Sequence, residues 1–382
     1  MWAELDRALQ SGAVIAYGAG LSPGWAAWLA AQLAERELVV VVARDDVHAR
    51  ELADDIGFFT KSDVVMLPGI DVSPYADLSP DRSCIVERMA TLYRLTQPEL
   101  RPSLIVTSAE ALARKTMPAS ELAARGRTVK KGESIDRDEL AALLVAGGWS
   151  RTPVVDEPGT FAIRGGVVDV FAPLAPHPIR IELFGDEVDS LRWFDAESQR
   201  TLREVDHVIL HPVRETISTG ASDVRSRVRA YADEIAFPSK ATRRLIEQLE
   251  AGDVFVGIEG LTPAFHDELV APESYVPAGA RWLVVDSEAC RRTLADLWKD
   301  AELRFGERKT TKELAYPPDR HYVTELALFQ SPRRIELPTL EVSGDSDATK
   351  LRVDVDHLAP LRQQLEHART FGDTEHVGPL ID

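Results

Sequence analysis

Cysteine is scarce in this chain. Its 382 residues include only Cys84 and Cys290, and neither belongs to a Cys-x-x-Cys pair or to a cluster of cysteines and histidines. This excludes a disulfide-stabilised scaffold and a zinc site built from thiolates, and we expect no bound metal and no cofactor. Low cysteine content is also typical of proteins in a reducing cytosol, which favours a cytoplasmic location.

Long hydrophobic runs are also missing. One of the longest, residues 38–43, is far shorter than the roughly 20 residues that cross a bilayer. The first twelve residues contain no basic segment followed by an apolar stretch, so no signal peptide is expected. We therefore expect no membrane partner.

Positive charge is under-represented. Lys and Arg number 44 against 62 Asp and Glu, which gives a net charge of −18. Broad, non-specific binding of nucleic acid requires many Lys and Arg residues to neutralise phosphates, so this class of protein is disfavoured. Hydrophobic residues make up 45% of the chain, which is ordinary for a globular protein. The length predicts two or three domains.

The first part of the chain alternates strands and helices. Short apolar runs predict strands at residues 13–17, 38–43, 64–67 and 104–107, and helical periodicity predicts helices at 23–35, 46–56, 83–95 and 109–115. Such alternation is typical of a parallel sheet covered by helices on both faces. We assign residues 1–126 to this α/β unit.

The pattern changes at residue 127. From 127 to 212 we expect an inserted antiparallel α+β domain, because one helix at 136–146 lies among several short strands. The predicted strands are 129–131, 152–155, 160–164, 167–171, 179–184, 187–194 and 205–210.

The α/β pattern resumes after the insert, and residues 213–345 are expected to complete the first unit. We predict helices at 224–235, 241–250 and 287–304, the last with Ser287 as its N-cap, and buried strands at 254–259 and 282–286. Residues 346–382 read as a linker and the start of a further domain, with a helix at 357–369. The sequence is expected to be a fragment of a longer protein.

A glycine-rich loop follows the first predicted strand and contains Gly18, Gly20 and Gly24. Such a loop before a helix can bind nucleotide phosphates. In the phosphate-binding pattern GxxxxGK[ST], Lys reaches the phosphates and Ser or Thr holds magnesium. Here Trp25 stands in place of the Lys and Ala26 in place of the Ser or Thr. We expect a degenerate loop without ATP hydrolysis, and nucleotide binding without turnover stays open as a weaker alternative.

An ATPase of this class also needs a pair of carboxylates at the end of a strand. The predicted strand 254–259 ends in Glu259 followed by glycine, so only one carboxylate is present. This second observation also disfavours catalysis.

The insert carries the most informative pattern. In residues 179–184, alternation puts Arg180, Glu182 and Phe184 on one face of a strand and three aliphatic residues on the other. An exposed Arg beside an aromatic residue is typical of a protein-binding surface. The alternative is that Phe184 packs under a loop and Arg180 pairs with neighbouring carboxylates.

Two separated segments resemble a known family. RGGVVDVF (164–171), RIELFGDEVDSLRWFD (180–195) and SQRTL (198–202) resemble the domain shared by the excision-repair helicase UvrB and the transcription-repair coupling factors. LPGIDVSPY (67–75) and RMATLYRL (88–95) resemble a second segment of the coupling factors. The resemblance covers about residues 10–345.

Missing features decide between the two families. UvrB hydrolyses ATP and holds DNA under a long tyrosine-rich hairpin, but residues 74–83 contain only Tyr75 and are too few for that hairpin. The resemblance is therefore to the N-terminal UvrB-homology module of the coupling factors, a degenerate RecA-like or P-loop-like fold. The alternative is a UvrB-like DNA-dependent ATPase or helicase subunit of excision repair.

The resemblance implies a recruiting role. It implies that the insert binds the repair protein UvrA, and the residues that carry over by motif are Arg164, Arg180 and Phe184. It also implies that a full-length parent would bind RNA polymerase, DNA and its own C-terminal inhibitory domain.

Overall fold

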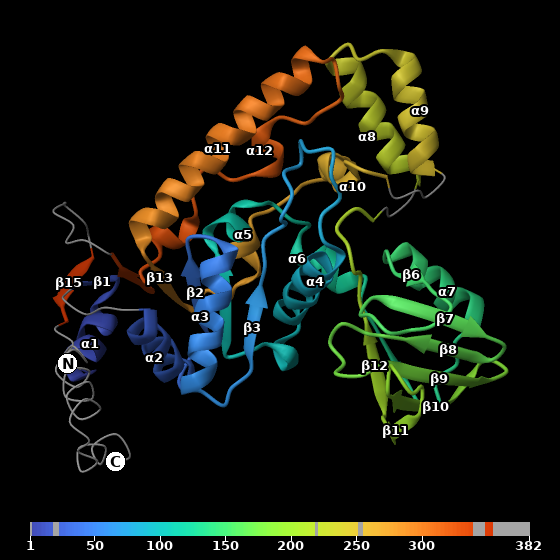
Figure 1. The fold of residues 1–382 in the computed structure, drawn as a ribbon, viewed down its shortest axis with the longest axis horizontal. Coiled ribbons are helices and arrows are strands. Elements are labelled where there is room, and N and C mark those ends of the chain that lie inside the picture. Colours follow the sequence, from blue (N-terminus) through green and yellow to red (C-terminus); the bar gives the residue numbers. More distant parts are fainter. Residues whose placement is uncertain (1, 18–22, 218–220, 251–254, 339–347, 354–382) are drawn as a thin grey trace, which may run out of the picture.

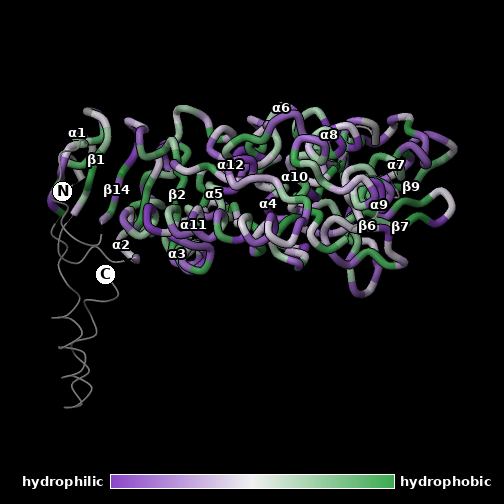
Figure 2. Tube along the Cα trace, turned by 90° about the horizontal axis from the view of Figure 1, so that it is seen from above, coloured by the Kyte–Doolittle hydropathy of each residue, from purple (hydrophilic) through white to green (hydrophobic). Residues whose placement is uncertain are grey.

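The computed structural model describes residues 2–17, 23–217, 221–250, 255–338 and 348–353. The expected fold class is confirmed: an α/β unit with a parallel sheet is interrupted by an insert built on a largely antiparallel sheet. The two parts lie side by side, with the insert at one end of the molecule and strands β1 (Val14–Tyr17) and β15 (Thr349–Arg352) at the other (Figure 1). Figure 2 shows the same side-by-side arrangement of the two parts from above.

The larger sheet has seven described strands in the order β15-β1-β14-β13-β2-β4-β3, all parallel. Besides β1 and β15, these are β2 (Val39–Ala43), β3 (Val64–Leu67), β4 (Leu104–Ser108), β13 (Arg281–Val285) and β14 (Arg334–Leu337). The run VVVVA in β2 is buried along its whole length, because a parallel sheet is covered on both faces.

Helices cover both faces of this sheet. On one face, Val39 and Val41 pack with α1 (Trp2–Ser11), α2 (Pro23–Ala34) and α3 (Asp46–Phe59). On the other face, Val40 and Val42 pack with α4 (Arg82–Thr96), α5 (Ala109–Ala113) and the long helix α11 (Ser287–Thr310). The two hydrophobic cores thus follow from the alternation of side chains along one strand.

The insert is built around a six-stranded sheet in the order β11-β10-β9-β8-β7-β6. Its strands are β6 (Ser150–Arg151), β7 (Thr160–Arg164), β8 (Val167–Val170), β9 (Ile179–Phe184), β10 (Glu187–Phe194) and β11 (Thr201–Glu204). Neighbouring strands are antiparallel except β6 and β7, which are parallel. The turns at Gly165 and Gly185 have φ of 61° and 63°, which glycine adopts without strain.

One helix covers the inner face of this sheet. Leu140 and Leu144 of α7 (Arg137–Ala146) pack against Val168 and Ile181. A separate two-stranded ladder, β5 (Arg127–Lys130) with β12 (His207–Leu210), brings the entry and exit of the insert together. The remaining described α-helices are α6 (Ala119–Ala124), α8 (Ala221–Glu234), α9 (Ser239–Glu250), α10 (Thr262–Phe265) and α12 (Pro318–His321).

Several local expectations were wrong. The described part of 254–259 is not a strand: it forms a turn and then a short 3-10 helix, Ile258–Leu261, which buries its apolar residues beside α8 and α10. The N-cap of α11 is Asp286, whose side chain accepts a hydrogen bond from the Ala289 N–H, and not Ser287. Residues 152–155 form no strand, since pairing ends at Arg151.

Other elements lack a clear sequence signal. Strand β14 lies between prolines, and β11 carries four exposed residues, so neither shows an apolar run. Strand β15 lies in 346–382 but pairs with β1 at the edge of the larger sheet. The helix expected at 357–369 lies outside the described residues.

Candidate protein-interaction face of the insert

The outer face of the six-stranded sheet carries the residues that the sequence singled out. Along β9 the expected alternation is confirmed: Ile179 and Ile181 are buried, whereas Arg180 and Glu182 are half-buried and Phe184 is exposed. Phe184 lies directly before the turn at Gly185 and is 83% exposed. It therefore does not pack under a loop.

Arg180 is held within the fold. Its Nε and Nη2 donate hydrogen bonds of 2.7 and 2.9 Å to the two carboxylate oxygens of Asp169, the residue opposite it on β8. Its guanidinium also lies 4.7 Å from the ring centroid of Phe194. Hydrogen bonding to Asp169 raises the pKa of the Arg180 guanidinium above its ordinary value. The alternative pairing with a neighbouring carboxylate is thus present, and it orients Arg180 rather than leaving it free.

A row of alternating charges crosses the next strands. Glu182 accepts a hydrogen bond of 2.6 Å from the Ser190 hydroxyl and lies 3.2 Å from Nη1 of Arg192. Arg192 in turn lies 3.9 Å from Glu204 on the edge strand β11. These ion pairs are partly exposed, so they contribute little to the stability of the fold. They determine the pattern of charge on the outer face.

Arg164 lies on the same face. It is exposed at the end of β7 and donates a hydrogen bond to the Pro153 carbonyl. Arg164 lies opposite Val167 of β8, and Val167 lies opposite Glu182 of β9. Arg164 is therefore level with Glu182, which lies between Arg180 and Phe184 along β9. The structure therefore brings all three predicted residues to one face of the sheet, on β7 and β9 with β8 between them.

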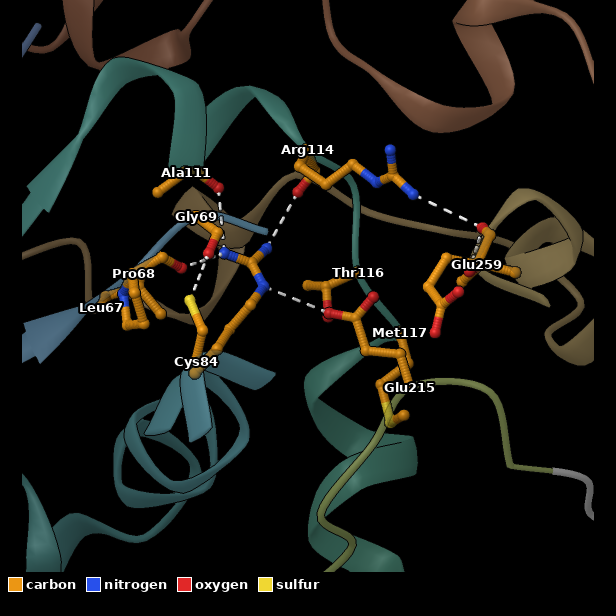
Figure 3. Close-up of polar contacts among 12 residues, drawn as sticks. Leu67, Pro68, Gly69, Cys84, Ala111, Arg114, Thr116, Met117, Glu215 and Glu259 are labelled. Carbon is orange, nitrogen blue, oxygen red and sulfur yellow. Dashed lines mark hydrogen bonds and ion pairs between the residues drawn. The ribbon is translucent and has the colours of Figure 1, made fainter. Parts of the chain in front are cut away.

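A buried arginine that the sequence did not assign to any role joins the insert to the α/β unit. Arg88 of α4 is fully buried, and it donates hydrogen bonds to the carbonyls of Pro68, Ala111 and Arg114 and, over 3.3 Å, to the Glu215 carboxylate (Figure 3). Glu215 lies where the chain returns from the insert. Two signals were available: an arginine on an otherwise apolar helix face, and its place at the start of the segment RMATLYRL, which resembles the coupling factors.

An aromatic contact fixes the same junction. The ring of Tyr93 on α4 stacks on His211 at the exit of the insert, with centroids 4.8 Å apart. Trp149 donates a hydrogen bond of 2.9 Å to the His211 carbonyl. Burial lowers the pKa of His211 to about 4, so its ring is neutral at neutral pH. The exit of the insert is thus held against α4.

The degenerate loop does not supply the groups of a nucleotide site in the residues that are described. Gly18 and Gly20 lie outside these residues. Gly24, Trp25 and Ala26 form the first turn of α2, where Trp25 is 8% and Ala26 is 1% exposed. Trp25 carries no cation and Ala26 carries no hydroxyl.

Two other residues bear on the helicase alternative, Glu259 and Tyr75. Glu259 lies in the 3-10 helix and not at a strand end, and burial raises its pKa. Tyr75 is buried and donates a hydrogen bond of 2.9 Å to the Tyr316 carbonyl, so it is not available to DNA. Within the described ranges, no three His, Cys, Asp or Glu side chains are grouped to hold a metal. No described helix is long and apolar enough to cross a membrane.

Comparisons with known proteins agree with this layout. Residues 128–215 match the UvrB interaction domain family. Over 91% of its length the chain is 35% identical to the transcription-repair-coupling factor of Myxococcus xanthus, and over 93% it is 33% identical to that of Escherichia coli. It covers 30% and 31% of those two relatives, so it spans about a third of their length.

Fold and matches together define a class: an α/β module interrupted by a UvrB interaction domain. Within that class, the matches support an N-terminal UvrB-like module of the transcription-repair coupling factors.

Proposed function

We propose that the chain is a non-catalytic recruiting module, which binds UvrA through the outer face of the insert. The exposure of Phe184 beside Arg164 and the oriented Arg180 is the observation that carries this proposal. The match to the UvrB interaction domain supports it. In a longer parent protein, this binding would bring UvrA to stalled RNA polymerase on DNA, and a C-terminal inhibitory domain would regulate the face.

The chemistry of the face suits a protein partner. Burying an aromatic side chain removes roughly 150–250 Å² from water, which at about 25 cal/mol per Å² corresponds to roughly 4–6 kcal/mol before the costs of association. Aromatic and arginine side chains are enriched among the residues that dominate binding energy. Phe184 would be the apolar anchor, and Arg164 would contact a carboxylate of the partner.

A binding experiment with purified UvrA tests the proposal. We expect Phe184→Ala to weaken binding at least tenfold in biolayer interferometry, and Arg164→Ala to weaken it less. Phe58→Ala is the matched control, because Phe58 is 85% exposed but lies on α3 of the other unit. Equal affinities for the native chain, Phe184→Ala and Arg164→Ala would refute the proposal.

We also propose that the chain does not turn over ATP. The replacement of the phosphate-binding Lys by Trp25 and of the magnesium-binding hydroxyl by Ala26 supports this. Phosphate release by the purified chain, with and without DNA, should equal the buffer background. Turnover above that background would instead support the UvrB-like ATPase alternative.

A further inference from the structure

The outer side of helix α3 departs from the pattern of an ordinary surface helix. Ala49, Leu52 and Ile56 are buried in the core beneath it. Four exposed residues form a stripe on the opposite side, namely Val47, Glu51, Asp54 and Phe58. Their spacing of i, i+4, i+7 and i+11 places them in one line along the helix. A surface helix normally presents polar residues to water, but both ends of this stripe are apolar.

The C-terminal end of the stripe is an exposed aromatic pair. Phe58 is 85% exposed, and its ring meets that of the half-exposed Phe59 edge to face, with centroids 5.2 Å apart. Among the described residues, neither ring belongs to the two cores of the α/β unit. Single exposed apolar residues are common on protein surfaces, whereas adjoining ones form a patch that is typical of an interaction site.

The centre of the stripe is negatively charged. Glu51 and Asp54 lie between the apolar ends, and Asp55 flanks them. In the part of the chain that the structure describes, these three carboxylates make no side-chain hydrogen bond and no ion pair. Arg50 of the same helix is engaged with a carboxylate of α4, and the exposed Lys61 lies beyond the end of the helix. The charge that the stripe offers to a partner is therefore negative.

The geometry of the stripe favours a helical occupant. Backbone N–H and C=O groups within a helix bond to each other, so α3 offers side chains and no open backbone edge to a partner. From Val47 to Phe58 the helix rises by about 16 Å at about 1.5 Å per residue. A partner helix of about three turns covers this length and presents its own side chains one turn apart on one face.

We propose that the α3 stripe binds an amphipathic helix of a partner protein, with arginine or lysine at the centre of the contact face and apolar residues at its ends. The basic side chains lie over Glu51 and Asp54, and the apolar ones cover Val47 and the Phe58–Phe59 pair. This site is separate from the proposed UvrA-binding face, since β3 and α4 lie between α3 and the insert in Figure 1.

The probe is a fluorescent, stapled helical peptide of about 16 residues, which is more than four turns. One face carries two leucines at each end and two arginines between them. We expect saturable binding by fluorescence anisotropy, and at least tenfold weaker binding when glutamates replace the arginines.

A charge swap tests the centre of the stripe. The double variant Glu51→Lys/Asp54→Lys should bind the arginine peptide at least tenfold more weakly and the glutamate peptide more tightly than the native chain does. The control Glu234→Lys/Glu247→Lys makes the same change in net charge at exposed positions of α8 and α9, and should change either affinity less than twofold.

The aromatic end has its own pair of variants. Phe58→Ala should weaken peptide binding at least fivefold, whereas Phe184→Ala, which removes an equally exposed ring from the insert, should leave it unchanged. Because UvrA binding is expected to respond to these two variants in the opposite way, failure of one proposal is distinguishable from failure of the other.

Hydrogen exchange of the native chain locates the peptide without any substitution. Bound peptide should slow exchange in the last turn of α3, at residues 56–59, and leave the amides of β9 unchanged. Absence of saturation at about 1 mM peptide, equal affinity for the arginine and glutamate peptides, an equal loss in the control double variant, or protection only elsewhere would each overturn the proposal.

Discussion

Asp169 holds the Arg180 guanidinium with two hydrogen bonds, and this pairing gives Arg180 a structural role as well as an interfacial one. The Asp169 side chain is 3% exposed and that of Arg180 is 22% exposed, so the pair is screened much less than a surface salt bridge. Loss of either partner leaves the other poorly solvated. A loss of UvrA binding in Arg180→Ala would therefore combine a missing contact with a disturbed sheet face.

This pairing makes a prediction for stability. Arg180→Ala and Asp169→Asn should each lower the free energy of unfolding by about 1–3 kcal/mol, and the double variant should lose less than the sum. Urea unfolding of the four proteins in a double-mutant cycle measures the coupling. Strictly additive losses would show that the ion pair contributes nothing to the fold.

Two glycines of the α/β unit should respond in opposite ways to the same substitution. A Cβ at Gly126 would lie 2.1 Å from the Tyr93 hydroxyl, on the ring that stacks against His211. A Cβ at Gly57, within helix α3, would meet no atom within 4 Å. We expect Gly126→Ala to destabilise by about 1–3 kcal/mol and Gly57→Ala to stabilise by about 0.5–1 kcal/mol. Thermal unfolding midpoints that shift in the same direction would contradict this.

At the scale of elements, α4 connects the two units. Its Arg88 joins three backbone carbonyls of the α/β unit to Glu215 at the exit of the insert, and its Tyr93 stacks on His211. A buried charge with four acceptors is costly to remove because each acceptor is left without a donor. Helix α4 thus supplies contacts that hold the exit of the insert to the α/β unit.

Arg88→Met should lower the free energy of unfolding by about 3–5 kcal/mol. Native-state hydrogen exchange should also quicken at residues 213–217, because the return segment loses its anchor. Arg50→Met is the control, since the Arg50–Glu87 contact between α3 and α4 is exposed. Unchanged exchange at 213–217 in a folded Arg88→Met protein would mean that other contacts hold the junction.

At the scale of the whole molecule, two buried histidines link stability to pH. Burial lowers the pKa of His211 to about 4 and that of His321 well below its ordinary value. In the unfolded chain both titrate near pH 6.5, so between these values the unfolded state binds more protons than the folded state. The contribution of these buried neutral histidines to the free energy of unfolding is therefore fully present above pH 6.5 and is lost as the pH falls towards 4.

For His211 alone this loss amounts to about 3 kcal/mol at pH 4. Urea midpoints between pH 7 and 4.5 should fall for the native chain and fall less for His211→Gln. The control His207→Gln, at an exposed position of β12, should follow the native profile. Identical pH profiles for all three proteins would exclude His211 as a source of the acid sensitivity.

Much of the architecture could be predicted because periodicity reports burial. The bounds of β3, β7, β9 and β10 agree with expectation, since each strand shows a continuous or alternating apolar pattern. The run at 254–259 misled because an apolar cluster also suits a short 3-10 helix, and β14 was missed because its four residues alternate charged and apolar side chains between two prolines. Local pattern does not encode which distant strands pair.

The candidate site, too, could be predicted from the sequence only in part. Arg180 and Phe184 were singled out because alternation on a strand fixes which face a side chain occupies, whereas Arg164 was carried over from the resemblance to the coupling factors. The bond between Arg180 and Asp169 depends on the register of two strands, and the role of Arg88 depends on carbonyls from three segments. Such contacts require the fold itself.

The order of strands in the large sheet also constrains the synthesis of the chain. Strand β2 pairs with β13 across about 240 residues, and β1 lies between β14 and β15. On a ribosome that adds roughly 5–20 residues per second, β1 and one edge of β2 wait on the order of ten seconds or more for these neighbours. The insert needs only its own contiguous strands, so it can close while the sheet around it is still half built, and the proposed UvrA-binding face exists before the domain that carries it.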